Sequence, residues 1–293
     1  MCFICDFKSR AADSAAPPRP EPLWSARRAF VLAAAGTAGA ALTGLPAHAQ
    51  VDVGKSSGLR KLVPAAELEN AARQQYGEMM AEARGKGTLM PDQHPQVRRL
   101  RSMAGRLIPH TLPWNSRARD WRWEVNLIQS DQINAFCMPG GKIAFYTGIL
   151  DKLQLSDDES AMIMGHEMAH ALREHARERL AKTQATGIGL SLLSSLFGLG
   201  ELGNVAASLG TQLLTLQFSR SDESEADLVG LELAARAAYQ PQASVSLWQK
   251  MAATSGSGGP AFLSTHPSGP DRIRELQSNV PRVQRLYEQA RKG

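Results

Sequence analysis

Residues 162–175 read MIMGHEMAHALREH, and the rest of the chain is interpreted around them. The stretch contains HEMAH at 166–170, which is an HExxH motif. Two histidines four residues apart lie about 40° apart around a helix of 3.6 residues per turn, so both imidazoles face one way. A catalytic zinc site takes three protein ligands and keeps a fourth position for water. The motif therefore predicts His166 and His170 as metal ligands and Glu167 as the general base for that water.

The flanking residues predict a mostly buried helix over about 157–181. SDDE at 156–159 has the pattern of a capping box, S-x-x-E, just before an apolar-periodic run. A core helix whose polar groups are satisfied locally is the alternative to a metal site. Burying three polar side chains within about one turn, with no partner for any of them, would cost on the order of several kcal/mol. This cost favours a metal.

The third ligand is expected downstream, where FSRSDESEAD at 218–227 opens a second helix. Glu223 and Asp227 are four residues apart and share a face. We predict that Glu223 binds the metal and that Asp227 accepts a hydrogen bond from a ligand histidine and fixes its tautomer. An acidic first turn favoured by the helix dipole is the alternative. Glu225 is a competing ligand, but it lies about 200° from Glu223, so both cannot face one metal.

These motifs resemble those of the zinc metallopeptidases of the HtpX and CAAX-prenyl-protease type. The resemblance covers about 95–280 and rests on HEMAH at 166–170, SRSDESEAD at 219–227, NAFCMPGGKI at 134–143, and THPS at 265–268 followed by Arg272. It is stronger to the soluble periplasmic branch, the BepA/LoiP-like and mitochondrial Oma-like proteases. Cys137 departs from the pattern, because a small apolar residue is usual there. The resemblance implies a gluzincin-type domain with one Zn²⁺ per chain.

A small antiparallel sheet is expected beside the HExxH helix. Apolar and polar residues alternate over 121–127, as in a half-buried strand. Further strands are expected at about 133–136 and 143–146, on either side of a PGG turn. The fold class is therefore α+β and mostly helical. The resemblance implies that Asn134 and Ala135 lie on an edge strand that pairs with the substrate backbone, with an ordinary hairpin as the alternative.

Most of the remaining chain is expected to be helical. Further helices are predicted at 65–84, 95–109, 219–238, 241–253, 270–278 and 281–291. His175 lies about 180° from His166 around the HExxH helix, so we expect it not to join the metal site.

The THPS element and the arginine that follows it contribute two further candidate site residues, His266 and Arg272. The resemblance places His266 at the cleft, where its ring is a candidate gate in zinc's open position in a resting state. A donor to the oxyanion is the alternative role. Arg272, Tyr146 and Tyr239 are the other candidate donors, and the sequence does not choose between them.

The N-terminal residues 1–49 are predicted to be an export signal. RRAFVL at 27–32 precedes an uncharged run rich in Ala and Gly, and AHA at 47–49 supplies a cleavage site near Ala49–Gln50. The twin-arginine route is favoured, with the Sec route as the alternative. Residues 50–64 are expected to be a flexible lead-in, and 65–293 the metallopeptidase domain.

The stretch 184–217 is unusually poor in charge, with Glu201 as its one charged residue. We predict a helical hairpin of small residues over the active-site cleft. It would serve as a lid or as a flap in peripheral contact with a membrane. A transmembrane span is the alternative, since the uncharged run is at the lower limit of length.

Charge and cysteine content narrow the function. The net charge is +5, and about +3 without the first 49 residues, which is no nucleic-acid signature. Cys137 is the one cysteine outside the predicted leader, so no internal disulfide is expected.

The prediction is a periplasmic zinc endopeptidase. By resemblance, its polypeptide substrates are misfolded or misassembled envelope proteins, and its partners include the outer-membrane assembly machinery. The alternative is a chaperone-like quality-control or assembly factor with a self-inhibited site.

Overall fold

The computed structural model describes residues 51–185, 213, 216–254, 261–267 and 269–292. The predicted export signal with its cleavage site lies outside these residues, as does most of the predicted hairpin at 184–217. Both therefore remain predictions. Among the described helices, none is long and apolar enough to cross a membrane.

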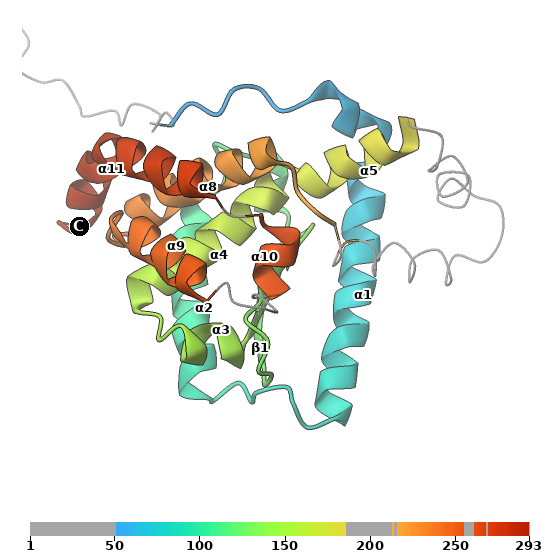
Figure 1. Ribbon diagram of the computed structural model, residues 1–293. Coiled ribbons are helices and arrows are strands. Elements are labelled where there is room, and N and C mark those ends of the chain that lie inside the picture. Colours follow the sequence, from blue (N-terminus) through green and yellow to red (C-terminus); the bar gives the residue numbers. More distant parts are fainter. Residues whose placement is uncertain (1–50, 186–212, 214–215, 255–260, 268, 293) are drawn as a thin grey trace, which may run out of the picture. The chain divides into compact units, whose positions relative to one another are not determined.

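Helices dominate the described part of the chain (Figure 1). In chain order the elements are η1 (Gly58–Leu62), α1 (Ala65–Gly85), α2 (Pro95–Leu107), η2 (Ile108–His110), η3 (Ser116–Arg119), β1 (Glu124–Ile128), β2 (Ala135–Met138), β3 (Lys142–Tyr146), α3 (Thr147–Lys152), α4 (Asp157–Leu172), α5 (His175–Ala185), α8 (Arg220–Arg236), α9 (Ala243–Ala253), α10 (Ala261–Thr265) and α11 (Pro270–Ala290). The predicted fold class, mostly helical with a small sheet, is confirmed.

The sheet is mixed rather than antiparallel. Its strand order is β1-β3-β2, with β2 antiparallel to β3 and β1 parallel to β3. The chain reverses direction twice, after β1 and after β2, and β3 then inserts between the other two strands. Because β3 runs the same way as β1, their pairing is parallel. The prediction of a wholly antiparallel sheet is therefore wrong for β1, since alternation identifies strands but not their neighbours.

The turn between β2 and β3 depends on glycine. Gly140 and Gly141 have φ angles of 81° and 77°, in the region that disfavours other residues. A Cβ on Gly141 would also lie 2.7 Å from the ring of Trp123. The turn leaves β2 at the edge of the sheet, on the side that faces α4.

Helix α4 is the buried centre of the domain, and α8 packs closely against it. The capping box predicted at its start is present, with Ser156 and Glu159 bonding to each other's backbone N–H groups. The two helices approach each other at Gly165 and Gly230. A Cβ on Gly230 would lie 2.6 Å from the backbone nitrogen of His166, and one on Gly165 would lie 2.8 Å from the carbonyl oxygen of Gly230. Only glycine allows this approach, which brings the HExxH motif against α8.

The helix predicted over 157–181 is broken into α4 and α5. Glu174 has a φ of 59°, outside the helical region. Its carboxylate is 3.3 Å from Arg60 and 2.8 Å from Arg177. These ion pairs stabilise the break. The partner from η1 is distant in the sequence, so the local pattern gave no sign of it.

The C-terminal helix is continuous where two helices were predicted. Pro281 lies inside α11, and its missing N–H costs the helix one backbone hydrogen bond. Leu276 and Val283, one on each side of the proline, are both buried in the core. The apolar face that they share offsets that cost.

Residues 50–64, which were predicted to be a flexible lead-in, contact the domain near both ends of this segment. Val51 is buried, and its backbone N–H donates to the Glu232 carboxylate at 3.0 Å. Val63 is buried against Leu68 and α5. The packed unit therefore includes residues that the sequence assigned to a linker.

Candidate metal centre and substrate cleft

Four buried side chains from three parts of the chain meet at one point. They are His166 and His170 from α4, Glu223 from α8 and His266 after α10, and their ligand atoms lie within 4.8 Å of one another. The Nε2 atoms of His166 and His170 are 3.1 Å apart, and Glu223 has one carboxylate oxygen within 3.5 Å of each. The sequence had predicted three of these four as ligands.

His166 is supported from α8 and α11. Its Nδ1 is 3.0 Å from the Asp227 carboxylate, which leaves Nε2 directed at the cluster. Arg272 donates to both oxygens of Asp227, at 2.7 and 2.8 Å, and lies 2.8 Å from Glu223. The Arg272 guanidinium also stacks on the Trp248 ring at 3.7 Å. Arg272 therefore neutralises the buried carboxylates instead of facing the cleft.

His170 has different neighbours. The Phe218 ring stacks on it, with centroids 3.9 Å apart. Its Nδ1 is 3.0 Å from Nδ1 of His175, which the break between α4 and α5 brings back toward the cluster. The premise that His175 lies on the far side of the helix is therefore wrong, because the helix does not continue, but His175 is not one of the four side chains of the cluster, as expected. Glu225, the competing ligand, lies away from the cluster and pairs with Arg173 at 2.8 Å.

His266 reaches the cluster through Nδ1 and the catalytic candidate through Nε2. Its Nδ1 is 3.0 Å from Glu223 and 3.3 Å from Nε2 of His166. Its Nε2 is 3.5 Å from a carboxylate oxygen of Glu167. Stacking on the Phe262 ring, with centroids 4.4 Å apart, holds the imidazole in this orientation.

Glu167 lies between the cluster and the edge of the sheet. The side chain is buried, and the backbone N–H of Cys137 donates to its carboxylate. Burial raises the pKa of Glu167, and the nearby His266 and His166 only partly oppose that shift. A carboxyl whose pKa is raised toward neutrality is suited to accepting and returning a proton.

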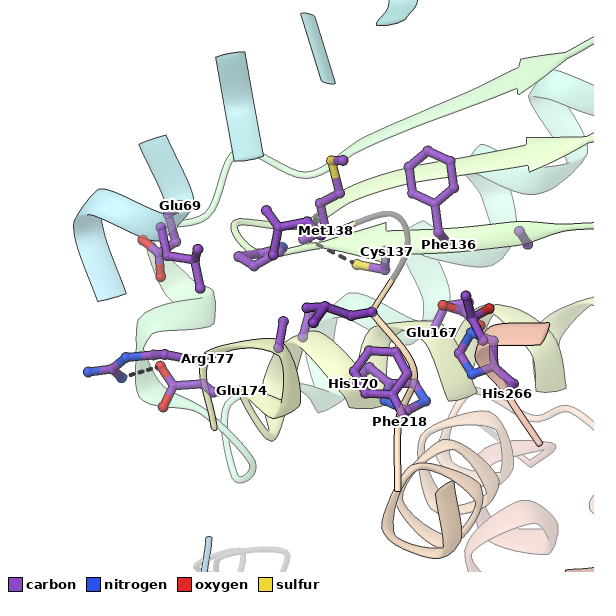
Figure 2. Close-up of a pocket in the computed structure, with 18 of the residues that line it drawn as sticks. Glu69, Phe136, Cys137, Met138, Glu167, His170, Glu174, Arg177, Phe218 and His266 are labelled. Atoms are coloured by element: carbon purple, nitrogen blue, oxygen red, sulfur yellow. Dashed lines mark hydrogen bonds and ion pairs between the residues drawn. The ribbon is translucent and has the colours of Figure 1, made fainter. Parts of the chain in front are cut away.

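The cluster opens into a cleft of about 940 Å³ (Figure 2). Strand β2 forms one wall, and Glu167 and His266 lie at one end. Glu69, Glu174 and Arg177 lie at the other end. Polar and apolar side chains both line the cleft. The apolar ones include Leu68, Trp121, Phe136, Met138, Leu216 and Phe218.

Among the described residues, one edge of β2 pairs with no other strand. Tyr146 donates its backbone N–H to the Asn134 carbonyl at 3.1 Å, which turns that carbonyl toward β3. In an antiparallel pair, alternate residues then face away, so Ala135 and Cys137 direct their backbone groups to the free edge. Of the two predicted substrate-binding residues, Ala135 lies on that edge. Asn134 lines the cleft and caps the Ala135 N–H with its side chain at 3.0 Å.

The two tyrosines predicted as candidate oxyanion donors differ in position. Tyr146 lines the cleft. Tyr239 does not; its ring lies beneath Arg106 at 4.1 Å, outside the cleft.

The chemistry of the cluster fits a zinc ion. Imidazole nitrogens and a carboxylate oxygen are its usual donors, and ligands about 2.1 Å from a tetrahedral ion lie roughly 3.4 Å apart. The spacings among His166, His170 and Glu223 are 3.1 to 3.5 Å. One carboxylate oxygen of Glu167 is buried without a hydrogen-bond partner among the described residues, and Oε2 of Glu223, which also lacks one, lies 2.8 Å from the Arg272 guanidinium in an ion pair. An ion would satisfy such oxygens.

The protonation of the cluster is uneven. Burial lowers the pKa of His166, but its bonds to Asp227 and Glu223 outweigh burial and raise that pKa to about 9. Burial holds the pKa of His170 well below its usual value, although Glu223 opposes it. Burial also raises the pKa of Glu223, yet hydrogen bonds from the three histidines bring it below its usual value, so this carboxylate stays ionised.

A family model describes most of the chain. The model for peptidase family M48 matches residues 93–280. The chain belongs to peptidase family M48. The family predicted by resemblance is thus confirmed, and the metallopeptidase class with it. The M48 match runs from just before α2 into the first half of α11, so it includes every member of the cluster.

Relatives of this M48 chain occur in mitochondria and bacteria. The mitochondrial metalloendopeptidase OMA1 of Schizosaccharomyces pombe is 34% identical over 216 residues, 73% of this chain and 61% of the relative. The metalloprotease LoiP of Escherichia coli is 26% identical over 210 residues, 68% of this chain and 76% of the relative. The beta-barrel assembly-enhancing protease of Yersinia pestis is 29% identical over 166 residues, 53% of this chain and 34% of the relative.

The chain spans between about a third and three fifths of the length of the mitochondrial relatives. Because these relatives include both mitochondrial and bacterial proteases, they establish the family but not the branch. The periplasmic branch stays a prediction.

Proposed function

We propose that this M48 protein is a zinc-dependent endopeptidase. The convergence of His166, His170 and Glu223 beside Glu167 and a free strand edge supports this function. Each part alone has a structural explanation. A buried cluster of metal-ligand side chains next to a buried carboxylate, at one end of a cleft, is the combination that peptide hydrolysis requires.

His166, His170 and Glu223 would hold the ion. When bound, zinc supplies a Lewis acid that polarises a carbonyl and makes water more acidic. Asp227 accepts a hydrogen bond from Nδ1 of His166 and so keeps Nε2 free for the ion. Glu167 takes a proton from the attacking water and later delivers it to the leaving amine.

The edge of β2 would position the substrate. An extended peptide added to this edge would bond to the carbonyls of Ala135 and Cys137. Such pairing would fix the peptide through its main chain, while apolar residues of the cleft wall such as Phe136 and Met138 would contact its side chains. This arrangement suits segments that are exposed and apolar, as in misfolded proteins.

Proteolysis of casein tests the activity. Purified protein should cleave casein, lose the activity in a chelator and regain it with Zn²⁺. Glu167→Gln is the matched control, because it keeps all three ligands and removes only the base. It should bind zinc normally and lose about 10²- to 10⁴-fold in rate. Cleavage by this variant at the wild-type rate would show that Glu167 is not the base.

We also propose that the protein acts in the periplasm, after export through residues 1–49. The signal pattern supports this location, and the name of the Yersinia pestis relative refers to β-barrel assembly. Misfolded or misassembled envelope proteins are the proposed substrates, with the outer-membrane assembly machinery as a partner. N-terminal sequencing of the exported protein should find Gln50 at or near its start. A retained leader would contradict cleavage.

A self-inhibited protease or chaperone-like factor is the second candidate, and the position of His266 favours it. Its Nδ1 lies where a fourth ligand would be, and its Nε2 approaches Glu167. As a gate, His266 would silence the resting enzyme, so His266→Ala should raise proteolysis at unchanged zinc content. As a transition-state donor, its loss should instead cost roughly 10²–10³ in rate.

A further inference from the structure

His175 is buried beside the cluster, but the proposed reaction does not use it. Its side chain is 2% exposed. Its Nδ1 lies 3.0 Å from Nδ1 of His170, and its Nε2 lies 3.4 Å from a carboxylate oxygen of Glu225. A buried imidazole needs a partner for each ring nitrogen, and these two contacts supply them.

The contact between the two histidines exists because the helix is broken. In a continuous helix, residues five apart lie about 140° apart around the axis, so the two rings would diverge. The positive φ of Glu174 ends the helix and starts α5 at His175. The ring then returns to the side of α4 that carries the metal ligands.

The directions of the hydrogen bonds follow from proton counting. The Nε2 atom of His170 faces Glu223 and His166, so a lone pair must stay there for an ion. The proton of the neutral ring is then on Nδ1, which donates to Nδ1 of His175. That nitrogen accepts, so the proton of His175 lies on Nε2 and points at Glu225.

The far end of this chain is anchored by charge. Arg173 donates to Glu225 through Nε at 2.8 Å and also to the Gly54 carbonyl at 3.0 Å. The same carboxylate oxygen of Glu225 lies 3.4 Å from Nε2 of His175 and is the acceptor that the Nε2 proton needs.

We propose that His175, held by Glu225 and Arg173, is a positioning residue that fixes the tautomer and ring orientation of His170. The inference rests on the proposed function in one respect, that His170 binds a metal. Histidine ligands depend on such outer partners, whose loss weakens metal binding by about 10- to 100-fold. The residue that supports His170 is a second imidazole, that of His175, whereas the residue that supports His166 is a carboxylate, that of Asp227.

Zinc affinity, measured by competition with a chromophoric chelator, tests the proposal without using proteolysis. His175→Ala and His175→Phe remove the acceptor, and Phe keeps a buried ring. Both should weaken zinc binding about 10- to 100-fold. His175→Asn places an amide oxygen near the former Nδ1 and should recover most of that loss. His110→Ala changes a histidine outside the cluster and should leave zinc affinity unchanged.

The outcomes separate the two proposals. Wild-type protein that binds no zinc would overturn the proposed function. Zinc binding that is equal in wild type, His175→Ala and His175→Phe would overturn only the positioning role. A loss in His175→Ala but not in His175→Phe would mean that His175 serves packing alone, and equal losses in Asn, Ala and Phe would mean that the acceptor is not what His170 needs; either result overturns the positioning role. Should His175→Ala fail to fold, the contrast between Phe and Asn gives the same decision.

Discussion

His166 and His170 are four residues apart on one helix, yet the protein supports them in different ways. The carboxylate of Asp227 contacts His166 directly from α8, and Arg272 holds that carboxylate from α11. His170 reaches its carboxylate, Glu225, only through His175 on α5. The first support depends on close packing between two helices. The second depends on a helix that ends early.

The two supports also differ in charge. The pKa of His166 is raised to about 9, whereas burial holds the pKa of His170 well below its usual value. In the metal-free protein at neutral pH, His166 is therefore protonated and His170 is neutral. Helix spacing aims both rings at one point, but tertiary neighbours decide where the protons are.

Removing the carboxylate that both histidines share should have the largest effect. Glu223→Ala deletes a direct ligand, so zinc affinity should fall by more than the roughly 10- to 100-fold expected for an outer partner. Chelator competition measures it. Glu225→Ala is the control, since Glu225 touches neither ligand histidine and its loss should cost less. A larger loss in Glu225→Ala than in Glu223→Ala would reverse the ligand assignment.

Asp227→Asn weakens only the His166 support. The amide keeps the shape and an acceptor but not the charge, and it leaves Arg272 without its full partner. Zinc affinity should fall about 10- to 100-fold, as for other outer partners. The double variant with His175→Ala separates the supports. If they act independently, the two losses add in free energy, whereas a smaller combined loss would mean that the supports are coupled.

Gly230→Ala should break the packing behind the His166 support. The new Cβ would lie 2.6 Å from a backbone atom of α4, which cannot move without shifting the motif. The free energy of unfolding should fall by about 1–3 kcal/mol. Gly105→Ala in α2 is the control, because nothing lies within 4 Å of its Cβ and the helix gains from alanine. Equal stability of wild type and Gly230→Ala, measured by denaturant, would contradict the contact.

The stability of the metal-free protein should fall as pH rises from 6.5 through 9. The pKa of His166 in the folded state is about 9, above its ordinary value of 6.5, so its stabilising contribution is complete below 6.5 and lost above 9. The slope from this group is at most about 1.4 kcal/mol per pH unit. Denaturant titrations in chelator measure it. An unchanged slope in Asp227→Asn would exclude Asp227 as a cause of the raised pKa.

Local spacing was enough to predict the His166 side of the site. The HExxH motif and the Glu223/Asp227 pair each lie within one helix, where 3.6 residues per turn fixes which side chains share a face. The sequence therefore indicated His166, Glu223 and Asp227, which meet there. The Gly165–Gly230 contact that joins the helices was not predicted, because it depends on two backbones 65 residues apart.

The His170 side was missed because the helix ends where no residue favours an end. ALREHAR contains neither glycine nor proline, and Glu174 adopts a positive φ through ion pairs with Arg60 and Arg177. Conversely, Pro281 predicted a helix boundary, but α11 continues through it because the helix face around it is buried. In both places tertiary contacts outweighed local preference.

The contact of Gly165 with Gly230 has a consequence for the continuity of the chain. It joins the histidines of α4 to the carboxylate of α8 through space, across an interface made of backbone and buried side chains. The ligands therefore need no covalent link between α5 and α8 to stay together. Two separately made polypeptides, one ending after α5 and the other beginning before α8, should assemble into a split protein with one complete metal centre.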